Sequence, residues 1–251
     1  MNQPLVVGNW KMNGTLSQAS NLAGAIVDGI AHKTPKVDLV LAPPATALVA
    51  VQQRIAGSGI SLAGQNCHWE DNGAFTGEIS PAMLADLSCT YVIVGHSERR
   101  HIFNESDEII GRKLAAAIKN NLRPILCVGE TLDQRTAGRT MEVILRQIQL
   151  ALKELNESVI ANLEIAYEPV WAIGTGHNAD SNQIAEVHGA IRSYLMSSPG
   201  KSSLRILYGG SVNPQNANDL SRISEVDGFL VGGASLKPES FLAIVRYFNE
   251  E

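Results

Sequence analysis

Short apolar runs recur along the chain at nearly regular intervals. They are rich in Val, Ile and Leu and show little alternation with polar residues, as is typical of parallel strands buried on both faces. The runs begin near Leu5, Val37, Ile60, Tyr91, Arg123, Leu163, Arg205 and Gly228. Their mean spacing, about 32 residues, is the length of one strand, one helix and two loops. The pattern therefore predicts eight parallel strands, with helices between them.

Helical patterns fill the intervals between the runs. The clearest joins Met141, Ile144, Leu145, Ile148, Leu152 and Leu155, and a second joins Ile184, Val187, Ile191 and Leu195. In both, the apolar residues fall on one face of a helix with 3.6 residues per turn. Three sites resemble helix N-caps, namely Ser80-Pro81, Asp180 and Asn213-Pro214. These starts agree with an alternation of strand and helix.

The alternation favours one domain over residues 1–251, a closed (β/α)8 barrel, because no linker and no shift in composition divides the chain. An open, doubly wound sheet is the alternative. Polar or glycine-rich clusters follow several different strands: Asn9 and Lys11, His96, Glu168, Gly209-Gly210 and Gly232-Gly233. A barrel builds its site from many strand ends, whereas an open sheet binds its ligand at one switch point. We therefore expect these clusters on one rim.

Composition and charge narrow the function classes. The chain has 251 residues, 20 basic and 25 acidic, so its net charge is −5, and 45% of its residues are hydrophobic. This composition excludes intrinsic disorder. The longest apolar stretch, residues 37–50, is interrupted by Asp38, Pro43 and Pro44, so no membrane span is expected. Because no Lys/Arg cluster is present, nucleic acid is not an expected partner either.

The N-terminus and the cysteines bear on location. Residues 1–8 lack the basic and long apolar regions of a secretion signal. Cys67, Cys89 and Cys127 form an odd set without C-x-x-C spacing, which indicates reduced thiols. Together these features predict a cytoplasmic protein.

Several local motifs are incomplete. Gly200-Lys201-Ser202 lacks the first glycine of a phosphate-binding P-loop, and Gly95-His96-Ser97 is followed by Arg99 where a nucleophile elbow needs glycine. Cys67-His68 has no partner pair at zinc-ligand spacing. We therefore expect no nucleotide-binding loop, no serine hydrolase site and no metal.

The segment 166–176, Ala-Tyr-Glu-Pro-Val-Trp-Ala-Ile-Gly-Thr-Gly, is the most informative stretch. It places the Glu168 carboxylate at the end of the sixth strand, before a segment that is stiff at Pro169 and Trp171 and permissive at Gly174 and Gly176. Stiff ends around a glycine-bearing middle suit a hinged lid. The alternative is a capping glutamate before a loop without function.

This segment resembles the active-site signature of the triosephosphate isomerase family. Similar stretches occur in the family's order along the whole chain, at residues 8–13, 73–78, 95–100, 208–212 and 230–236. One departure is His177-Asn178-Ala179, where the family often has Lys-Thr-Ala. It bears on the kinetics of the lid and not on the reaction class.

The resemblance implies a cofactor-free isomerase of glycolysis and gluconeogenesis. It would interconvert dihydroxyacetone phosphate and D-glyceraldehyde 3-phosphate by moving a proton between adjacent carbons through an enediolate. By this resemblance Glu168 is the base, and His96 is a neutral imidazole that donates to the substrate oxygens. In the family, a helix N-terminus lowers the pKa of this histidine. Taken alone, His96 would more often be a structural histidine.

The resemblance also assigns three polar neighbours. Lys11 would supply positive potential for an anionic substrate, and Asn9 would lie near the substrate oxygens. Glu98 would pair with Lys11 and help to relay protons. The alternatives are a solvated charge for Lys11 and a surface ion pair with Arg99 or Arg100 for Glu98.

The substrate phosphate would bind to backbone N–H groups of Gly174, Ser211, Gly232 and Gly233. Glycine allows close approach of the main chain, and a short helix after the eighth strand adds a favourable dipole. A single Gly-Gly pair usually marks only a turn. Two pairs after strands seven and eight are a stronger signal, because barrels commonly bind phosphate there.

The loop of residues 65–80 carries Trp69 and Phe75 between glycines. A loop of this length is usually functional or disordered, and exposed rings suggest burial against a partner. The resemblance implies a homodimer in which Thr76 contacts the Asn9 and Lys11 region of the other subunit. The alternative is a loop folded back on its own barrel.

Two other functions fit a phosphate-binding barrel. One is a Schiff-base aldolase or a sugar-phosphate epimerase, which needs a buried strand lysine or metal ligands, and neither is evident. The other is a binding protein that has kept the fold and lost the chemistry. The presence of Asn9, Lys11, His96 and Glu168 together argues against it.

Overall fold

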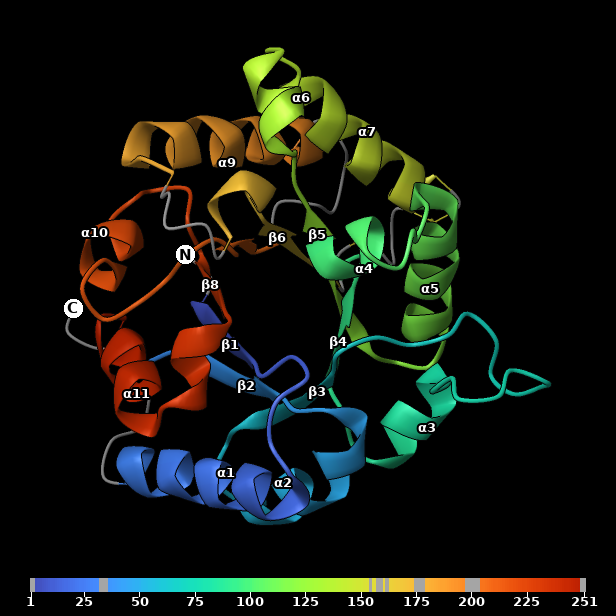
Figure 1. The fold of residues 1–251 in the computed structure, drawn as a ribbon, viewed down its shortest axis with the longest axis vertical. Helices are drawn as coiled ribbons and strands as arrows, with labels where there is room; N and C mark the ends of the chain where they lie inside the picture. The colour runs from blue at the N-terminus through green and yellow to red at the C-terminus, as the bar shows by residue number, and fades with distance from the viewer. Residues whose placement is uncertain are drawn as a thin grey trace.

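A computed structural model describes residues 3–31, 36–153, 155–156, 160, 163–173, 179–196 and 204–248. Its eight strands are parallel and form a closed barrel in sequence order, in which β8 pairs with β1. Figure 1 shows this barrel surrounded by helices. The predicted (β/α)8 barrel is therefore confirmed, and the open sheet is wrong.

The strands lie where the apolar runs predicted them, each beginning within one residue of the expected position. Their bounds are β1 (Leu5–Asn9), β2 (Asp38–Ala42), β3 (Ser61–Gly64), β4 (Tyr91–Val94), β5 (Arg123–Val128), β6 (Glu164–Tyr167), β7 (Ile206–Tyr208) and β8 (Gly228–Val231).

Helices and short 3₁₀ turns alternate with the strands. The helices are α1 (Leu16–Ile30), α2 (Leu48–Ile55), α3 (Pro81–Asp86), α4 (Ser97–His101), α5 (Asp107–Lys119), α6 (Leu132–Thr136), α7 (Thr140–Leu152), α9 (Ser181–Met196), α10 (Ala217–Ser221) and α11 (Pro238–Arg246). The 3₁₀ turns are η1 (Ala45–Ala47), η2 (Val170–Ala172) and η3 (Gly233–Leu236). None of the helices in the described ranges is long and apolar enough to cross a membrane.

Two of the three predicted N-caps are confirmed. Ser80 Oγ accepts the N–H of Met83 at 3.2 Å, and Asp180 Oδ1 accepts the N–H of Gln183 at 2.9 Å. Asn213 instead caps a turn, since its side chain accepts the N–H groups of Gln215 and Asn216, and α10 begins only at Ala217. The helical pattern that ran to Leu155 also ends earlier, at Leu152.

Two apolar layers fill the molecule. Alternate strand residues point into the barrel, where Leu5, Val7, Val40, Ile93 and Leu207 belong to one buried cluster. The residues between them, such as Val6 and Val92, pack outward against the helices. This alternation follows from the period of two along a strand. Because both faces of the strands are filled by apolar side chains, the polar groups of the site lie at the C-terminal ends of the strands.

Candidate active site

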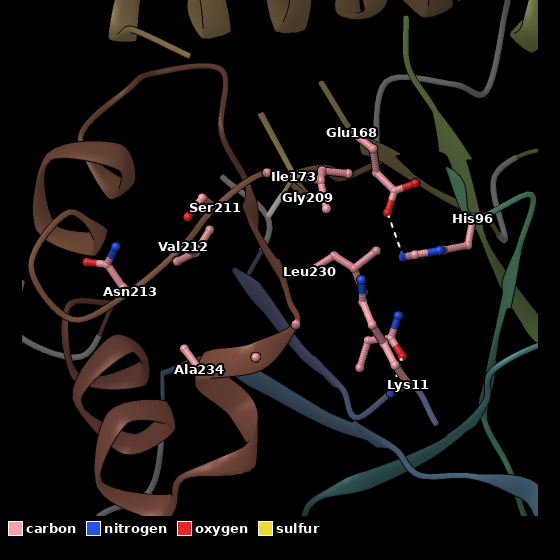
Figure 2. A pocket seen from close by; sticks show the side chains of 14 residues that line it. Lys11, His96, Glu168, Ile173, Gly209, Ser211, Val212, Asn213, Leu230 and Ala234 are labelled. Atoms are coloured by element: carbon pink, nitrogen blue, oxygen red, sulfur yellow. Dashed lines mark hydrogen bonds and ion pairs between the residues drawn. The ribbon is translucent and has the colours of Figure 1, made fainter. Parts of the chain in front are cut away.

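A cavity of about 340 Å³ opens at the C-terminal ends of the strands (Figure 2). It is lined by residues that follow β1, β4, β6, β7 and β8, among them Asn9, Lys11, His96, Glu168, Ser211, Gly232 and Gly233. Ser211 and Ala234 lie on the side opposite His96. The structure therefore brings most of the predicted site residues to one cavity. Gly174 lies outside the described residues, as do His177 and Asn178.

Glu168 is held at the end of β6 by its main chain and its side chain. Its N–H donates to Val128 O at 2.7 Å, and its side chain is 2% exposed. Carboxylate Oε1 is 3.0 Å from His96 Nε2, and Oε2 accepts the N–H of Ser97 at 2.8 Å. Figure 2 shows the two side chains pointing toward each other. The base candidate is thus buried and fully paired in the resting site.

Burial raises the pKa of Glu168, but the neighbours outweigh burial and the pKa is lowered. The main opposing causes are the charge of His96 and its hydrogen bond, followed by the Ser97 N–H and the charge of Lys11. A lowered pKa keeps the carboxylate ionised at neutral pH. Glu168 can therefore accept a proton from a substrate that enters the cavity.

His96 is the N-cap residue of α4, and its ring is buried. Burial is the largest single influence and lowers its pKa, but the charge of Glu168, its hydrogen bond to the ring and the charge of Glu98 together raise the pKa above its usual value. The N–H of Glu98, in the first turn of α4, points at Nδ1 with a separation of 3.3 Å. A ring nitrogen that accepts an N–H carries no proton, so this contact leaves one proton, on Nε2. The contact favours the uncharged ring and the Glu168 charge opposes it, and the neutral imidazole stays a prediction.

Lys11 lies just past β1 with φ of +52°, a left-handed conformation that non-glycine residues seldom adopt. Its N–H donates to Asn9 Oδ1 at 3.0 Å, and its carbonyl accepts from the Gln65 amide at 2.8 Å. Nζ is 2.6 Å from Glu98 Oε1. Backbone strain of this kind costs on the order of 1 to 3 kcal/mol and clusters at functional sites. The contacts hold Lys11 in this conformation, and its side chain lines the cavity.

Glu98 therefore pairs with Lys11. The two arginines that were its alternative partners are engaged elsewhere, Arg99 with Glu105 and Arg100 with Asp107, each at 2.6 Å. Glu98 does not line the main cavity. It lies on a second hollow of about 350 Å³, which shares Lys11 and His96 with the first.

The opposite side of the cavity suits an anion. Gly233 opens η3, and a Cβ there would have no neighbour within 4 Å, so the main chain is open to approach. A Cβ on Gly232 would lie 3.5 Å from Lys11 Cε, so the lysine stem runs beside this turn. A cation next to accessible backbone groups favours negative charge.

Several residues that line the cavity, and one buried carboxylate behind it, were not predicted from the sequence. Leu230 lines the cavity from β8, and Glu130 is fully buried just after β5. Glu130 Oε1 accepts from Trp171 Nε1 at 2.9 Å and from Tyr167 Oη at 3.2 Å. A carboxylate at the end of a strand was the signal used for Glu168, and Glu130, two residues past β5, carries a weaker form of it. Leu230 carries no such signal, because it resembles any other strand residue.

Within the described ranges, no group of three or more His, Cys, Asp or Glu side chains is arranged to hold a metal ion.

The fold and this cavity define a (β/α)8-barrel enzyme that performs acid–base chemistry on a small anion. An ionised carboxylate, an imidazole and a lysine meet at the strand ends, where barrel enzymes carry their sites.

Comparison with known proteins narrows this class. The sequence matches the triosephosphate isomerase family over residues 4–248. It is 48% identical over 249 residues to the triosephosphate isomerase of Prosthecochloris aestuarii, with 98% of both chains covered. The enzyme of Aquifex aeolicus is also 48% identical, over 97% of this chain and 99% of that one. The crystal structure of the Bartonella henselae triosephosphate isomerase superposes with a TM-score of 0.90 at 40% identity, covering 99% and 100% of the two chains. The chain belongs to the triosephosphate isomerase family.

Proposed function

We infer that this chain interconverts dihydroxyacetone phosphate and D-glyceraldehyde 3-phosphate, the glycolytic reaction of its family, without a cofactor. The observation that carries the proposed mechanism is the 3.0 Å contact between Glu168 and His96 at the cavity. A C–H group on the carbon next to a carbonyl is only a weak acid. Its deprotonation needs a base together with donors that stabilise the oxyanion as it forms.

We propose that Glu168 is the base and that it exchanges partners when substrate binds. In the resting site it is held by His96 and the Ser97 N–H. Substrate carbonyl oxygens would take over the Nε2–H of His96, which frees the carboxylate to face the carbon. The same carboxyl group then returns the proton to the adjacent carbon, while the hydroxyl proton of the substrate passes to the neighbouring oxygen, so that the hydroxyl and the carbonyl exchange places. The raised pKa of His96 depends mainly on the facing carboxylate, so its cause is removed when Glu168 turns away.

His96, Lys11 and Asn9 are proposed to stabilise the enediolate. A neutral Nε2–H donor and a nearby ammonium act on charge that develops only in the transition state. One preorganised donor of this kind contributes on the order of 2.7 to 4 kcal/mol in other enzymes. Glu98 holds the Lys11 ammonium at 2.6 Å, which sets the direction of the lysine. A relay of protons through Glu98 remains a prediction.

The phosphate is proposed to bind at Ser211, Gly232 and Gly233, with Gly174 from the lid. The open space at Gly233 and the lysine stem beside Gly232 support this assignment. Closure of residues 169–179 would exclude water and protect the enediolate. The beginning of this segment is already anchored, because Trp171 in η2 donates to Glu130.

The test is a coupled isomerase assay on the wild type and on Glu168→Ala. We expect kcat to fall by several orders of magnitude with a modest change in KM, because the base acts mainly on the barrier. Glu239→Ala, an exposed glutamate in α11, is the matched control and should be fully active. Comparable activity in wild type and Glu168→Ala would reject the base assignment. No activity in either would favour the binding-protein alternative.

We also propose a homodimer formed through the loop of residues 65–80. This loop projects from the barrel between β3 and α3 (Figure 1). His68 stacks on Trp69 and packs at a tilt against Phe75, with ring centroids 4.0 and 4.1 Å apart, and this packing gives the loop a defined shape. Met12 and Phe103 line one hollow near this loop and are 95% and 62% exposed, and exposed apolar side chains that lie together are typical of interaction sites.

The second hollow lies between the Lys11 region and this chain's own loop, since Gly77 and Glu78 of that loop line it. It has a volume of about 350 Å³ and is lined by Met12, Phe103 and Lys11, so the same loop of another copy could reach the site region there. Sedimentation at micromolar concentration should give the mass of two chains. A fully active monomer would overturn this proposal.

The cytoplasmic location stays a proposal. Cys67, Cys89 and Cys127 are all free and buried, and unpaired thiols are typical of proteins in reducing compartments. Fractionation of cells that express the chain, with detection by antibody, would test it.

A further inference from the structure

We propose that Gln147 is a positioning residue for the base, acting through the peptide of Gly129. The proposal rests on the assignment of Glu168 as base. Gln147 lies in α7 and is 5% exposed. Its Oε1 accepts the N–H of Gly129 at 2.8 Å, and its Nε2 donates to the carbonyl of Gly129 at 3.1 Å. Both halves of the side-chain amide thus pair with both backbone groups of one residue, as a neighbouring strand would.

Gly129 lies directly against the backbone of the base. A Cβ at this position would lie 1.7 Å from Glu168 O and 3.4 Å from Glu168 Cα. Only glycine fits there, and any shift of the Gly129 peptide toward β6 meets the Glu168 carbonyl. The position of Gly129 therefore limits where the backbone of the base can lie.

The residues on either side of Gly129 bind the same segment. Val128 O accepts the N–H of Glu168 at 2.7 Å, and Glu130 O accepts the N–H of Val170 at 3.1 Å. Residues 128–130 therefore form a template for residues 168–170, which include the base and the beginning of the lid. β5 ends at Val128, so the middle of the template lies beyond the strand ladder. Gln147 supplies the hydrogen bonds that the ladder no longer provides.

Loss of these two bonds would leave the N–H and C=O of Gly129 unpaired in a buried place. Buried unpaired groups move toward other partners or toward water, because leaving them unsatisfied is costly. Displacement of the template would shift the carboxylate relative to the substrate carbon. A misplacement of about 1 Å can lower a rate on the order of 10²-fold. The part of the phosphate side that follows β7 and β8, namely Ser211, Gly232 and Gly233, does not touch this template and should not change.

The first experiment compares Gln147→Met with Gln149→Met. Methionine keeps the length of the side chain and removes both hydrogen bonds, while Gln149 is an exposed residue of the same helix. We expect kcat of Gln147→Met to fall roughly 10- to 100-fold. KM and the inhibition constant of inorganic phosphate should change by less than about threefold, since uniform binding is retained. Gln149→Met should match the wild type. A folded Gln147→Met variant with wild-type kcat would overturn the proposal.

A double variant separates positioning from general damage. If Gln147 acts through Glu168, then adding Gln147→Met to Glu168→Ala should not lower the residual activity further. A purely structural role would lower the residual rate again, and that result would overturn the proposal. Failure of the base assignment looks different, because Glu168→Ala alone would then retain activity.

Gln147→Glu covers the case in which the methionine variant does not fold. Its ionised carboxylate can accept from the Gly129 N–H but repels the Gly129 carbonyl, whereas its protonated form can accept and donate. Activity relative to wild type should therefore recover as the pH is lowered through the titration of this carboxyl group. A relative activity independent of pH would count against the proposal.

Discussion

The two ends of the barrel use buried charge in opposite ways, and β6 contributes a carboxylate to both. Glu168, just past the C-terminal end of β6, faces the cavity and His96. Glu164, at the N-terminal end of the same strand, is fully buried between two guanidinium groups. Its Oε1 lies 2.6 Å from Arg123 Nη2 and 2.7 Å from Arg205 Nη2, and its Oε2 accepts the N–H of Arg205 at 3.1 Å.

At the N-terminal end the charges are satisfied inside the protein. Arg205 also donates to Asp38 at 2.6 Å, to Tyr91 Oη at 3.0 Å and to Gln3 O at 3.1 Å, so it joins several strands. At the C-terminal end, Lys11 is held in a left-handed conformation, and the Glu168–His96 pair must separate for the proposed reaction. One end is arranged for stability and the other for chemistry, as is general for barrel enzymes.

The largest loss of stability should come from disrupting the ion pairs at the N-terminal end of the barrel. Glu164→Gln keeps the shape and removes the charge between Arg123 and Arg205. Removing one partner of a buried ion pair costs about 3–5 kcal/mol. The loss should fall mainly on Arg205, whose side chain is 6% exposed and is left with the partly exposed Asp38, since Arg123 is 40% exposed. Urea unfolding should show this loss. The activity per folded molecule should match the wild type, and a large fall in kcat of the folded variant would contradict the division between the two ends.

At the C-terminal end of the barrel, Lys11→Gly should lower activity without lowering stability. Removing the ammonium should lower kcat/KM by about 10²–10³-fold, or 2.7 to 4 kcal/mol, if Lys11 stabilises the developing charge. Glycine adopts positive φ without strain, so the free energy of unfolding should not fall. Lys11→Ala is the control, because it loses the same charge but keeps the strain.

The two Lys11 variants should be equally inactive, and the glycine variant should be about 1 kcal/mol more stable than the alanine variant. Equal stability of the two would show that the φ of +52° carries no cost.

The barrel could be predicted from the sequence because every strand is buried on both faces, and continuous apolar runs record that burial directly. Glu168, His96 and Lys11 were found because polar residues interrupt the chain at strand ends. Glu164 was not singled out, although it stands four residues before Glu168. The difference between the two carboxylates depends on their partners from distant parts of the chain, arginines for Glu164 and His96 for Glu168, and these contacts cannot be deduced from the sequence pattern.

Gln147 was missed for a related reason. It falls within the apolar face of α7, where a polar residue reads as a minor break in the helical pattern. Its partner is a glycine backbone, which has no side-chain signature at all. Asn213 was misplaced as a helix cap because the turn it caps and a helix start share the same sequence signal. Interactions through the main chain are therefore the part of the site that sequence reasoning recovers least.

Two buried histidines differ in the direction in which their surroundings shift the pKa, and this difference makes stability depend on pH. His96 faces a carboxylate, which raises its pKa. His188 in α9 packs against Tyr167 and Tyr208, and no carboxylate raises its pKa. Burial lowers the pKa of His188 from 6.5 to about 4. In the range between these values the unfolded state binds more protons, so acid destabilises the fold.

The stabilisation from neutral His188 should be complete above about pH 6.5 and lost as the pH falls toward 4, by up to about 3 kcal/mol. His188→Gln removes this titration. We therefore expect the free energy of unfolding to fall by about 2 kcal/mol more in the wild type than in the variant between pH 7.5 and 5. Parallel losses in the two proteins would show that His188 does not carry the acid sensitivity.

The smallest loss of stability should come from the exposed ion pair at the N-terminal end of the barrel. Asp38 and Glu164 bind the same arginine at 2.6 and 2.7 Å, but the Asp38 side chain is 43% exposed and that of Glu164 is 0%. Water and salt screen the exposed pair, so Asp38→Asn should cost only about 0.2–1 kcal/mol, and less at high salt. The loss from Glu164→Gln should depend little on salt, because a buried pair is screened less. If urea unfolding gave equal losses for both variants, the number of contacts to Arg205 and not the depth of burial would determine the strength of this end.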